Sequence, residues 1–294
     1  MKKLTTALCL FTLICLGMTP GHAADQPSPL QTQGDPFMGD WQGEDADGKA
    51  LCVQVIALPE DVYRANIMAE FDTPKKPLAV LNGKRSRDKV VFKRSPKGGP
   101  FLVLSLTKGS FSGSLSGTRE TTVELKPVTR LSPTLGKEPP ANAVILFDGT
   151  SLDSWMQASD GKPIQWKLLD NGIMEVGKGG IVSKHGFKDH TLHLEFRTPF
   201  MPGESGQGRG NSGAYFQGRY EVQILDSYGL KTTWNDCGGI YNVSVPKVNM
   251  AAPPLQWQTY DATFYAPRFD EAGNKIKEAS VTVIHNGVLI QEDV

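Results

Sequence analysis

The residues best suited to chemistry lie in one segment, residues 209–226 (RGNSGAYFQGRYEVQILD). Glu221 and Gln223 alternate with two apolar residues in a strand-like run, so burial of the apolar pair leaves the carboxylate and the amide on the opposite face. Asp226 falls on the other parity, but a β-bulge at the end of the strand would bring it to the same face. Two carboxylates and an amide on one sheet face could transfer protons and hold the hydroxyl groups of a sugar.

The surroundings of this strand favour a site. A glycine-rich, polar stretch leads into Arg209 and Asn211, and Tyr215 stands among several interleaved aromatic residues. Another polar and aromatic loop follows at residues 234–236 (WND). The alternation alone is also typical of the solvent-exposed face of an amphipathic strand, so the pattern leaves both interpretations open.

A second set of polar residues occupies the predicted strand Thr191–Arg197. Its apolar residues share one face, which places His193 and Glu195 together on the other. That face is either the floor of the site or a cross-strand network of ion pairs. His193 is a candidate acid–base group, because histidine is the side chain that most often transfers protons in enzymes. The histidines of this region do not show the spacing of metal ligands, and the sequence leaves the identity of any metal site unknown.

Composition indicates an all-β protein without a nucleic-acid or anionic-membrane partner. The 294 residues carry 31 basic and 31 acidic side chains, so no charge excess attracts a polyanion. Glycine (31) and proline (20) are plentiful and no long helix-periodic run occurs, which is typical of short strands joined by turns. Asn82-Gly83 and Asn286-Gly287 are two of the predicted hairpin turns.

The start of the chain predicts export. Lys2 and Lys3 precede an apolar run from Leu8 to Met18, and small residues follow at a cleavage site, as in a secretory signal peptide. We therefore expect a periplasmic or secreted protein with no integral membrane segment after cleavage. The predicted segments are a signal peptide (1–24), a linker (25–36), a small β-barrel or sandwich accessory domain (37–130), a Pro-rich linker (131–142) and a second β domain (143–294).

Two cysteines remain after this cleavage, Cys52 and Cys237. An exported protein permits a disulfide, but the two residues fall in different predicted domains. Two buried, unpaired cysteines are the favoured interpretation.

Five motifs in the second domain occur in an order that resembles a known family. They are ILFDGTSLDSW, HLEFR, GNSGAYFQGRYEVQILDS, CGGIY and WQTYDATFYAPRF. This half of the chain is similar to the 3-keto-disaccharide hydrolase family, whose fold is a concanavalin A-like lectin/glucanase jelly roll. Members usually continue into further strands, so the resemblance implies either that this sequence is a fragment, which is the favoured interpretation, or that the final strands are supplied in another way.

The resemblance implies an enzyme that acts on glycosides already oxidised at carbon 3. The ketone acidifies the hydrogen on carbon 2; a base removes it, the group on carbon 1 leaves, and water adds to the resulting 3-keto-2-hydroxyglucal. Such a site needs a base and stabilisation of the enolate oxygen. A divalent metal cation is one source of that stabilisation, although no cofactor follows with certainty. The chemistry also implies a partner oxidoreductase that makes the ketone.

The family's motifs fall on several of the residues identified above. On this resemblance, Glu221 or Asp226 is the proton-transferring carboxylate; His193 is a further catalytic candidate because of its residue type and not because of the resemblance. The substrate-binding candidates are Glu195, Arg209, Asn211, Gln223 and Tyr215.

Two other functions remain open on the same scaffold. One is a non-catalytic carbohydrate-binding module, because a fold does not decide a function. The other is a conventional glucanase, which would use two carboxylates about 5–5.5 Å apart. The amide of Gln223 stands where such glucanases usually carry an acidic residue, which weakens that alternative.

Overall fold

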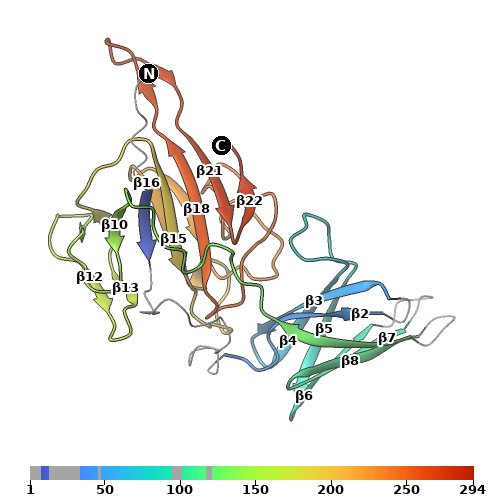
Figure 1. The fold of residues 1–294 in the computed structure, drawn as a ribbon. Coiled ribbons are helices and arrows are strands. Elements are labelled where there is room, and N and C mark those ends of the chain that lie inside the picture. The colour runs from blue at the N-terminus through green and yellow to red at the C-terminus, as the bar shows by residue number, and fades with distance from the viewer. Residues whose placement is uncertain (1–7, 13–33, 46–47, 95–100, 117–120) are drawn as a thin grey trace.

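The protein is all-β and consists of a closed barrel followed by a second β region (Figure 1). The computed structural model describes residues 8–12, 34–45, 48–94, 101–116 and 121–294. In these residues the one helical element is the short 3₁₀ helix η2 (Gly206–Gly208). No helix in the described part of the chain is long and apolar enough to cross a membrane. The predicted fold class is therefore confirmed at the level of all-β.

Residues 39–128 form an eight-stranded closed barrel. Alternate residues of its strands, such as Val53, Val55 and Phe92, point inward and are almost completely buried with Trp41 in a single core. The sequence left a barrel and a sandwich open; the strands close into the barrel. They are β2 (Gly39–Glu44), β3 (Ala50–Leu58), β4 (Val62–Met68), β5 (Ala79–Ser86), β6 (Lys89–Arg94), β7 (Phe101–Thr107), β8 (Ser110–Ser116) and β9 (Thr121–Val128).

One turn prediction in the barrel is wrong. Asn82 and Gly83 lie inside β5, not at a hairpin turn. A Cβ at Gly83 would come within 2.8 Å of the ring of Phe92. The glycine is therefore explained by the close approach of an aromatic side chain from β6. By contrast, Asn286 and Gly287 both have positive φ and form the predicted turn between two strands.

The second region contains a six-stranded sheet and four two-stranded pairs. The sheet has the order β10 (Val144–Phe147), β1 (Leu8–Thr12), β15 (His190–Phe196), β18 (Gln258–Tyr265), β21 (Ser280–His285) and β22 (Val288–Gln291). The pairs are β11 (Trp155–Gln157) with β14 (Ile181–Ser183), β12 (Gln165–Leu168) with β13 (Met174–Lys178), β16 (Ser212–Phe216) with β17 (Tyr220–Ile224), and β19 (Arg268–Phe269) with β20 (Lys275–Lys277).

The backbone of Leu8–Thr12 forms β1, which runs parallel to both β10 and β15. This strand falls inside the predicted signal peptide, whose other residues lie outside the described part of the chain. Export therefore stays a prediction.

One apolar core lies between the six-stranded sheet and the β16–β17 hairpin. Leu192 and Leu194 of β15 reach it from one side, and Val222 and Ile224 of β17 reach it from the other. Because side chains alternate along a strand, the polar residues of β15 and those of β17 point away from this core in opposite directions. The jelly-roll topology itself is not confirmed by these sheets and stays a prediction.

Cys52 and Cys237 are both buried and both free. The favoured interpretation from the sequence is confirmed. Cys237 contacts the hydroxyl of Tyr260, and burial raises the pKa of its thiol to about 11. The thiol is therefore protonated at neutral pH and packs as a small apolar group.

Candidate active site

The face of the β16–β17 hairpin that points away from the core brings several predicted site residues together. Tyr215 pairs with Glu221, and Gly213 pairs with Gln223, so these four residues share one face. On the other side of β17, the Tyr241 amide donates to the Glu221 carbonyl at 3.0 Å. Two isolated β-bridges at Ile240 hold this neighbouring segment beside β17, and Tyr241 extends the face by one more aromatic residue.

Glu221 is the carboxylate at the centre of this face. It is partly buried, and burial raises its pKa, while a hydrogen bond from the Tyr215 hydroxyl acts in the opposite direction. Burial, followed by the same hydrogen bond to Glu221, raises the pKa of Tyr215 to about 12, so the phenol stays protonated and donates. Glu221 is therefore a carboxylate of increased basicity held by a neutral donor, which suits a general base.

Aromatic side chains surround Glu221. Tyr215 is 59% exposed, and the rings of Trp234 and Tyr241 meet edge to face with centroids 5.0 Å apart. Aromatic faces of this kind pack against the apolar faces of sugar rings. Tyr215 was predicted from its position, and the loop at Trp234 was noted in the sequence. Tyr241 was not singled out, because its place beside Glu221 depends on a pairing that local patterns do not reveal.

Gln223 lies beneath this face in a network of amides. It is 1% exposed, and its Nε2 donates to Gln207 Oε1 at 2.8 Å and to the Asn235 carbonyl at 3.3 Å. The exposed Asn211 donates to the same Gln207 oxygen at 3.2 Å. Gln223 therefore supports the site from below, whereas Asn211 remains open to a ligand. Gln207 was missed because its glycine-rich surroundings suggested an irregular loop, although they fold into η2.

Arg209 and Asp226 pair with each other instead of facing Glu221. Arg209 Nη2 and Nε donate to Asp226 Oδ2 at 2.6 and 3.1 Å, and the two residues are 5% and 2% exposed. Burial raises the pKa of Asp226 against the opposing effect of Arg209. The predicted roles of Asp226 in proton transfer and of Arg209 in sugar binding do not fit this placement, because both side chains are enclosed and paired with each other.

His193 and Glu195 lie on the far side of the core from Glu221. His193 Nδ1 contacts Asp261 Oδ1 at 2.6 Å, and its Nε2 contacts Glu195 Oε1 at 3.3 Å. The linker covers this cluster: the Gly136 amide donates to Glu195, and Thr134 donates to Asp261. Of the two alternatives from the sequence, the ion-pair network describes this cluster, in which His193 and Glu195 are buried and Asp261 is partly exposed. A catalytic role of His193 and a floor role of Glu195 in the Glu221 site do not fit this geometry.

This cluster makes stability depend on pH. Burial lowers the pKa of His193, but its hydrogen bonds to Asp261 and Glu195 outweigh that effect and raise the pKa to about 9. Because the folded value exceeds the ordinary 6.5, the contribution to stability is complete below pH 6.5 and is lost as pH rises to 9. We expect a loss of about 3 kcal/mol in the free energy of unfolding over this range, measured with urea.

The control for that prediction is His193→Gln, which removes the titrating group. The variant should be less stable at pH 6 and should lose most of the dependence between pH 6.5 and 9. Equal slopes in the two proteins would show that another group is responsible.

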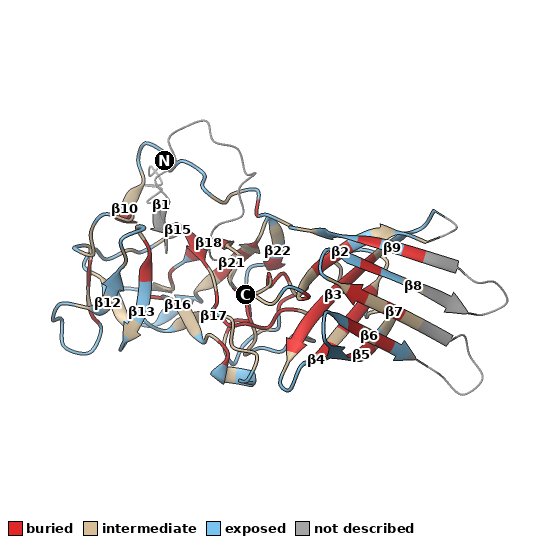
Figure 2. Ribbon diagram, turned by 90° about the horizontal axis from the view of Figure 1, so that it is seen from below, coloured by how far each residue is buried: buried red, intermediate tan, exposed pale blue. Residues whose placement is uncertain are grey.

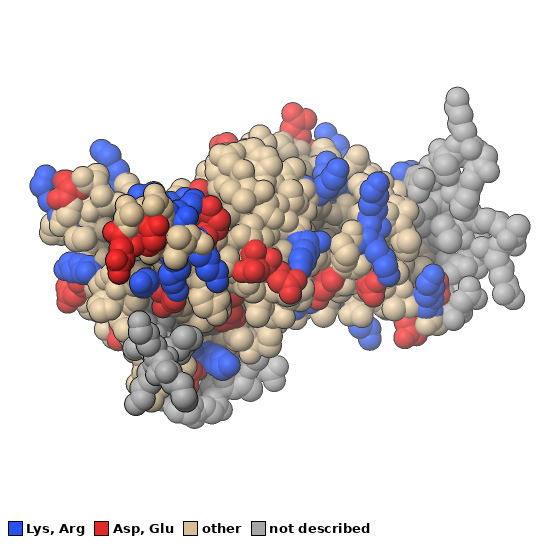
Figure 3. All heavy atoms as spheres, turned by 90° about the horizontal axis from the view of Figure 1, so that it is seen from above, with Lys and Arg blue, Asp and Glu red and all other residues tan. Residues whose placement is uncertain are grey.

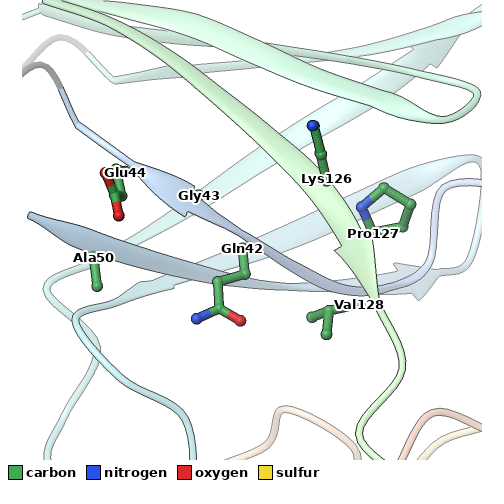
Figure 4. Close-up of a pocket in the computed structure, with 7 residues that line it drawn as sticks. All are labelled: Gln42, Gly43, Glu44, Ala50, Lys126, Pro127 and Val128. Carbon is green, nitrogen blue, oxygen red and sulfur yellow. The ribbon is translucent and has the colours of Figure 1, made fainter. Parts of the chain in front are cut away.

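Two hollows in the surface lie away from Glu221. One of about 380 Å³ opens on the barrel wall, where Gln42, Ala50 and Lys126 project from β2, β3 and β9 (Figure 4). Another of about 300 Å³ lies between the barrel and the segment Pro253–Gln256. Neither is lined by a predicted site residue. The site around Glu221 lies on the sheet face that it shares with the exposed Tyr215.

No metal centre is formed by the described residues: no three His, Cys, Asp or Glu side chains among them are arranged to hold an ion. Figure 3 shows basic and acidic side chains interspersed over the visible face, as expected from the balanced net charge.

Comparison with known proteins identifies the second β region. The model of the family described as the 3-keto-alpha-glucoside-1,2-lyase-like domain matches residues 142–294. A crystal structure from Parabacteroides distasonis, named provisionally as a glycosyl hydrolase, is 39% identical with a TM-score of 0.49; the match covers 53% of this chain and 66% of that one. A second structure from the same organism with the same name is 18% identical with a TM-score of 0.35, over 50% and 70% of the two chains. No curated protein matches.

Proposed function

Because this chain belongs to the 3-keto-alpha-glucoside-1,2-lyase-like family, we propose that it is a carbohydrate-active enzyme that cleaves 3-keto-glycosides through elimination and hydration. The observation that supports this most is the environment of Glu221. A partly buried carboxylate of raised pKa, held by the Tyr215 hydroxyl, stands among aromatic side chains that suit a sugar ring. A carboxylate suited to act as the base therefore lies on the part of the chain that the family model covers.

Glu221 would take the proton from carbon 2. The adjacent ketone makes that hydrogen acidic, so a carboxylate whose basicity is increased by burial is a sufficient base. The electron pair of the C2–H bond forms the enolate, and collapse of the enolate expels the substituent on carbon 1 with the C1–O pair. The leaving oxygen takes up a proton, and the sugar becomes the 3-keto-2-hydroxyglucal.

Hydration completes the reaction. The hydroxyl of a water molecule adds to carbon 1, and Glu221 passes the remaining proton of that water to carbon 2, because the proton taken from carbon 2 has left with the departing oxygen. The sum is hydrolysis of the glycosidic bond with no change in oxidation state. The Tyr215 hydroxyl, a neutral donor beside Glu221, would stabilise the enolate oxygen, which carries the negative charge after proton removal.

The surroundings of Glu221 favour elimination over the paired-carboxylate route of a conventional glucanase. That route needs two carboxylates facing one glycosidic bond. The sequence candidate for the second one, Asp226, is enclosed with Arg209, and the side-chain partner of Glu221 is a phenol. A site with one base and one neutral donor matches removal of an acidic C–H proton.

Turnover in D₂O tests this mechanism. Elimination followed by hydration places one solvent deuterium on carbon 2 of the 3-keto-glucose product, whereas direct displacement at carbon 1 places none there. The product should carry the label at early times, detected by mass spectrometry and NMR. Free 3-keto-glucose incubated alone in D₂O controls for spontaneous exchange, and unlabelled product would exclude the mechanism.

Gly213 offers a test of the position of Glu221. A Cβ at Gly213 would overlap Glu221 Oε1, the end of a flexible side chain that can move away. Gly213→Ala should therefore lower kcat by roughly tenfold with little change in melting temperature, because the carboxylate is displaced. The control is Gly203→Ala, where no atom lies within 4 Å of the added carbon. Equal kcat in both variants would argue against Glu221 as the base.

The cellular setting is part of the same proposal. The basic and apolar start of the chain supports export, and the need for a 3-ketone implies an oxidoreductase that makes it. Fractionation of cells that express the full chain would test the first point. A chain that stays in the cytoplasm with residues 1–24 intact would contradict it.

A further inference from the structure

The barrel is packed against the second region through the outer face of two of its strands. Residues of β3 are buried on both faces (Figure 2): Val53 and Val55 belong to the barrel core, whereas Gln54 and Ile56 point outward and are still only 9% and 0% exposed. Asn66 of β4, which pairs with Gln54, is 5% exposed. An outer barrel face is normally hydrated, so its burial marks an interface with the second region.

The segment that covers this face begins directly after β17. Asn66 Nδ2 donates to the Gly229 carbonyl at 2.7 Å. Gly229 has a φ of +65°, and a Cβ there would lie 2.7 Å from the end of the Ile56 side chain. Only glycine fits this turn, both in its backbone conformation and in its distance from the barrel wall.

A buried hydrogen bond joins the same segment to the barrel. The hydroxyl of Tyr228, a residue that is 1% exposed, donates to Asp40 Oδ1 at 2.7 Å. The other oxygen of Asp40 accepts from Arg130 Nε at 2.8 Å, and Arg130 also pairs with Asp72 and stacks on Phe71. The Tyr228 hydroxyl therefore bonds to a charged network formed by the barrel and by Arg130, which directly follows its last strand β9.

From Tyr228 the chain runs on to the candidate site. Ser227 Oγ accepts from the Cys237 amide at 3.1 Å, so the two ends of the intervening loop are held together. The carbonyl of Asn235 accepts from Gln207 and Gln223. The loop ends where the Gly238 amide donates to the Gln223 carbonyl and the Tyr241 amide donates to the Glu221 carbonyl. One segment thus begins on the barrel and ends beside Glu221.

We propose that the barrel is a structural part of the sugar site, in which the Tyr228–Asp40 hydrogen bond fixes the position of residues 228–241 and therefore of Trp234, Asn235 and Tyr241 around Glu221. Tyr228 and Asp40 are positioning residues that act through this segment and do not touch the substrate. The inference goes beyond the sequence prediction of an accessory domain. Its kinetic part rests on the proposed function, whereas its structural part does not.

The decisive variant is Tyr228→Phe in the full chain, which removes one hydroxyl and keeps the ring. A hydrogen bond to a carboxylate is strong enough for its loss to accelerate local opening by about tenfold. Amide hydrogen exchange of residues 231–241, followed by mass spectrometry, should show that acceleration, because the Gly238 and Tyr241 amides are bonded to β17. With a 3-keto-glucoside, kcat/KM should fall by about tenfold for the same reason.

The matched control is Tyr63→Phe. The Tyr63 hydroxyl donates to Asp35 at 2.5 Å, also from a buried tyrosine to a carboxylate, but its ring lies in the barrel core. Both variants should lose thermal stability to a similar extent. Only Tyr228→Phe should change exchange at residues 231–241 and kcat/KM, which a general loss of stability would not do.

Each outcome decides one claim. If amide exchange at residues 231–241 is unchanged in Tyr228→Phe, the inference is overturned whatever the activity. If exchange is faster but kcat/KM stays within twofold of the wild-type value, the inference is overturned as well. If the wild type does not turn over the keto sugar, the proposed function fails. In that case, the dissociation constant of 3-keto-glucose is measured for the wild type and for Tyr228→Phe in place of kcat/KM. Equal dissociation constants for the two proteins would overturn the inference.

Discussion

Replacing Glu221 by Gln should reduce kcat on a 3-keto-glucoside by about 10³-fold, because an amide cannot take the proton from carbon 2. Binding of the sugar should change little, since the substitution keeps the shape of the side chain and its contact with the Tyr215 hydroxyl. Turnover measured at saturating substrate, together with a dissociation constant from titration, separates the two effects. The raised pKa of Glu221 also predicts that wild-type activity falls, on the acid side, at a higher pH than an ordinary glutamate would give.

Glu175→Gln serves as the control for this variant. Glu175 is an exposed carboxylate on β13, in the same region but outside the candidate site. Its substitution should leave both kcat and binding unchanged. If Glu221→Gln turned over substrate as fast as the wild type, the base would have to be sought elsewhere on the chain.

Asp226→Asn should destabilise the fold by about 3 kcal/mol, because the Arg209 guanidinium would stay buried without a counter-charge. The pair is enclosed, and its two hydrogen bonds of 2.6 and 3.1 Å are the side-chain contacts that hold it. Urea unfolding at pH 7 gives the change in free energy. The loss should arise from the charge left behind on Arg209.

That cause can be tested directly. The double variant Arg209→Met/Asp226→Asn removes the stranded guanidinium and should recover part of the lost stability. Lys75→Met, which breaks the exposed pair with Glu70, should have no measurable effect. A double variant less stable than Asp226→Asn alone would show that Arg209 stabilises the fold by other contacts.

Local patterns were sufficient for the all-β fold class and for the face on which Glu221 lies, although not for every turn. The alternation around Glu221 correctly places it on the face opposite Val222, because a period of two follows from strand geometry alone. The same rule places His193 and Glu195 on one face of β15. It does not say which side of the core each face occupies, and that depends on how the two sheets pack.

Local sequence patterns could not predict the environment of residues whose partners are distant along the chain. Asp226 looks like a second catalytic carboxylate until the enclosing contact with Arg209 is known. The linker around Gly136 looks like a spacer because of its prolines, yet it covers the His193 cluster. Tyr228 shows no pattern of its own, since its partner Asp40 is 188 positions away along the chain.

The most direct test of this account is turnover of a 3-keto-glucoside compared with its unoxidised parent, with and without EDTA. We predict cleavage of the keto sugar alone, because only the ketone makes the carbon 2 hydrogen acidic enough for Glu221. Activity that survives EDTA would show that Glu221 and its neighbours catalyse the reaction without a metal ion. Loss of activity in EDTA would show that a cation stabilises the enolate. Cleavage of the unoxidised parent, or binding of either sugar without cleavage, would contradict the account and point to a conventional glycosidase or a binding module.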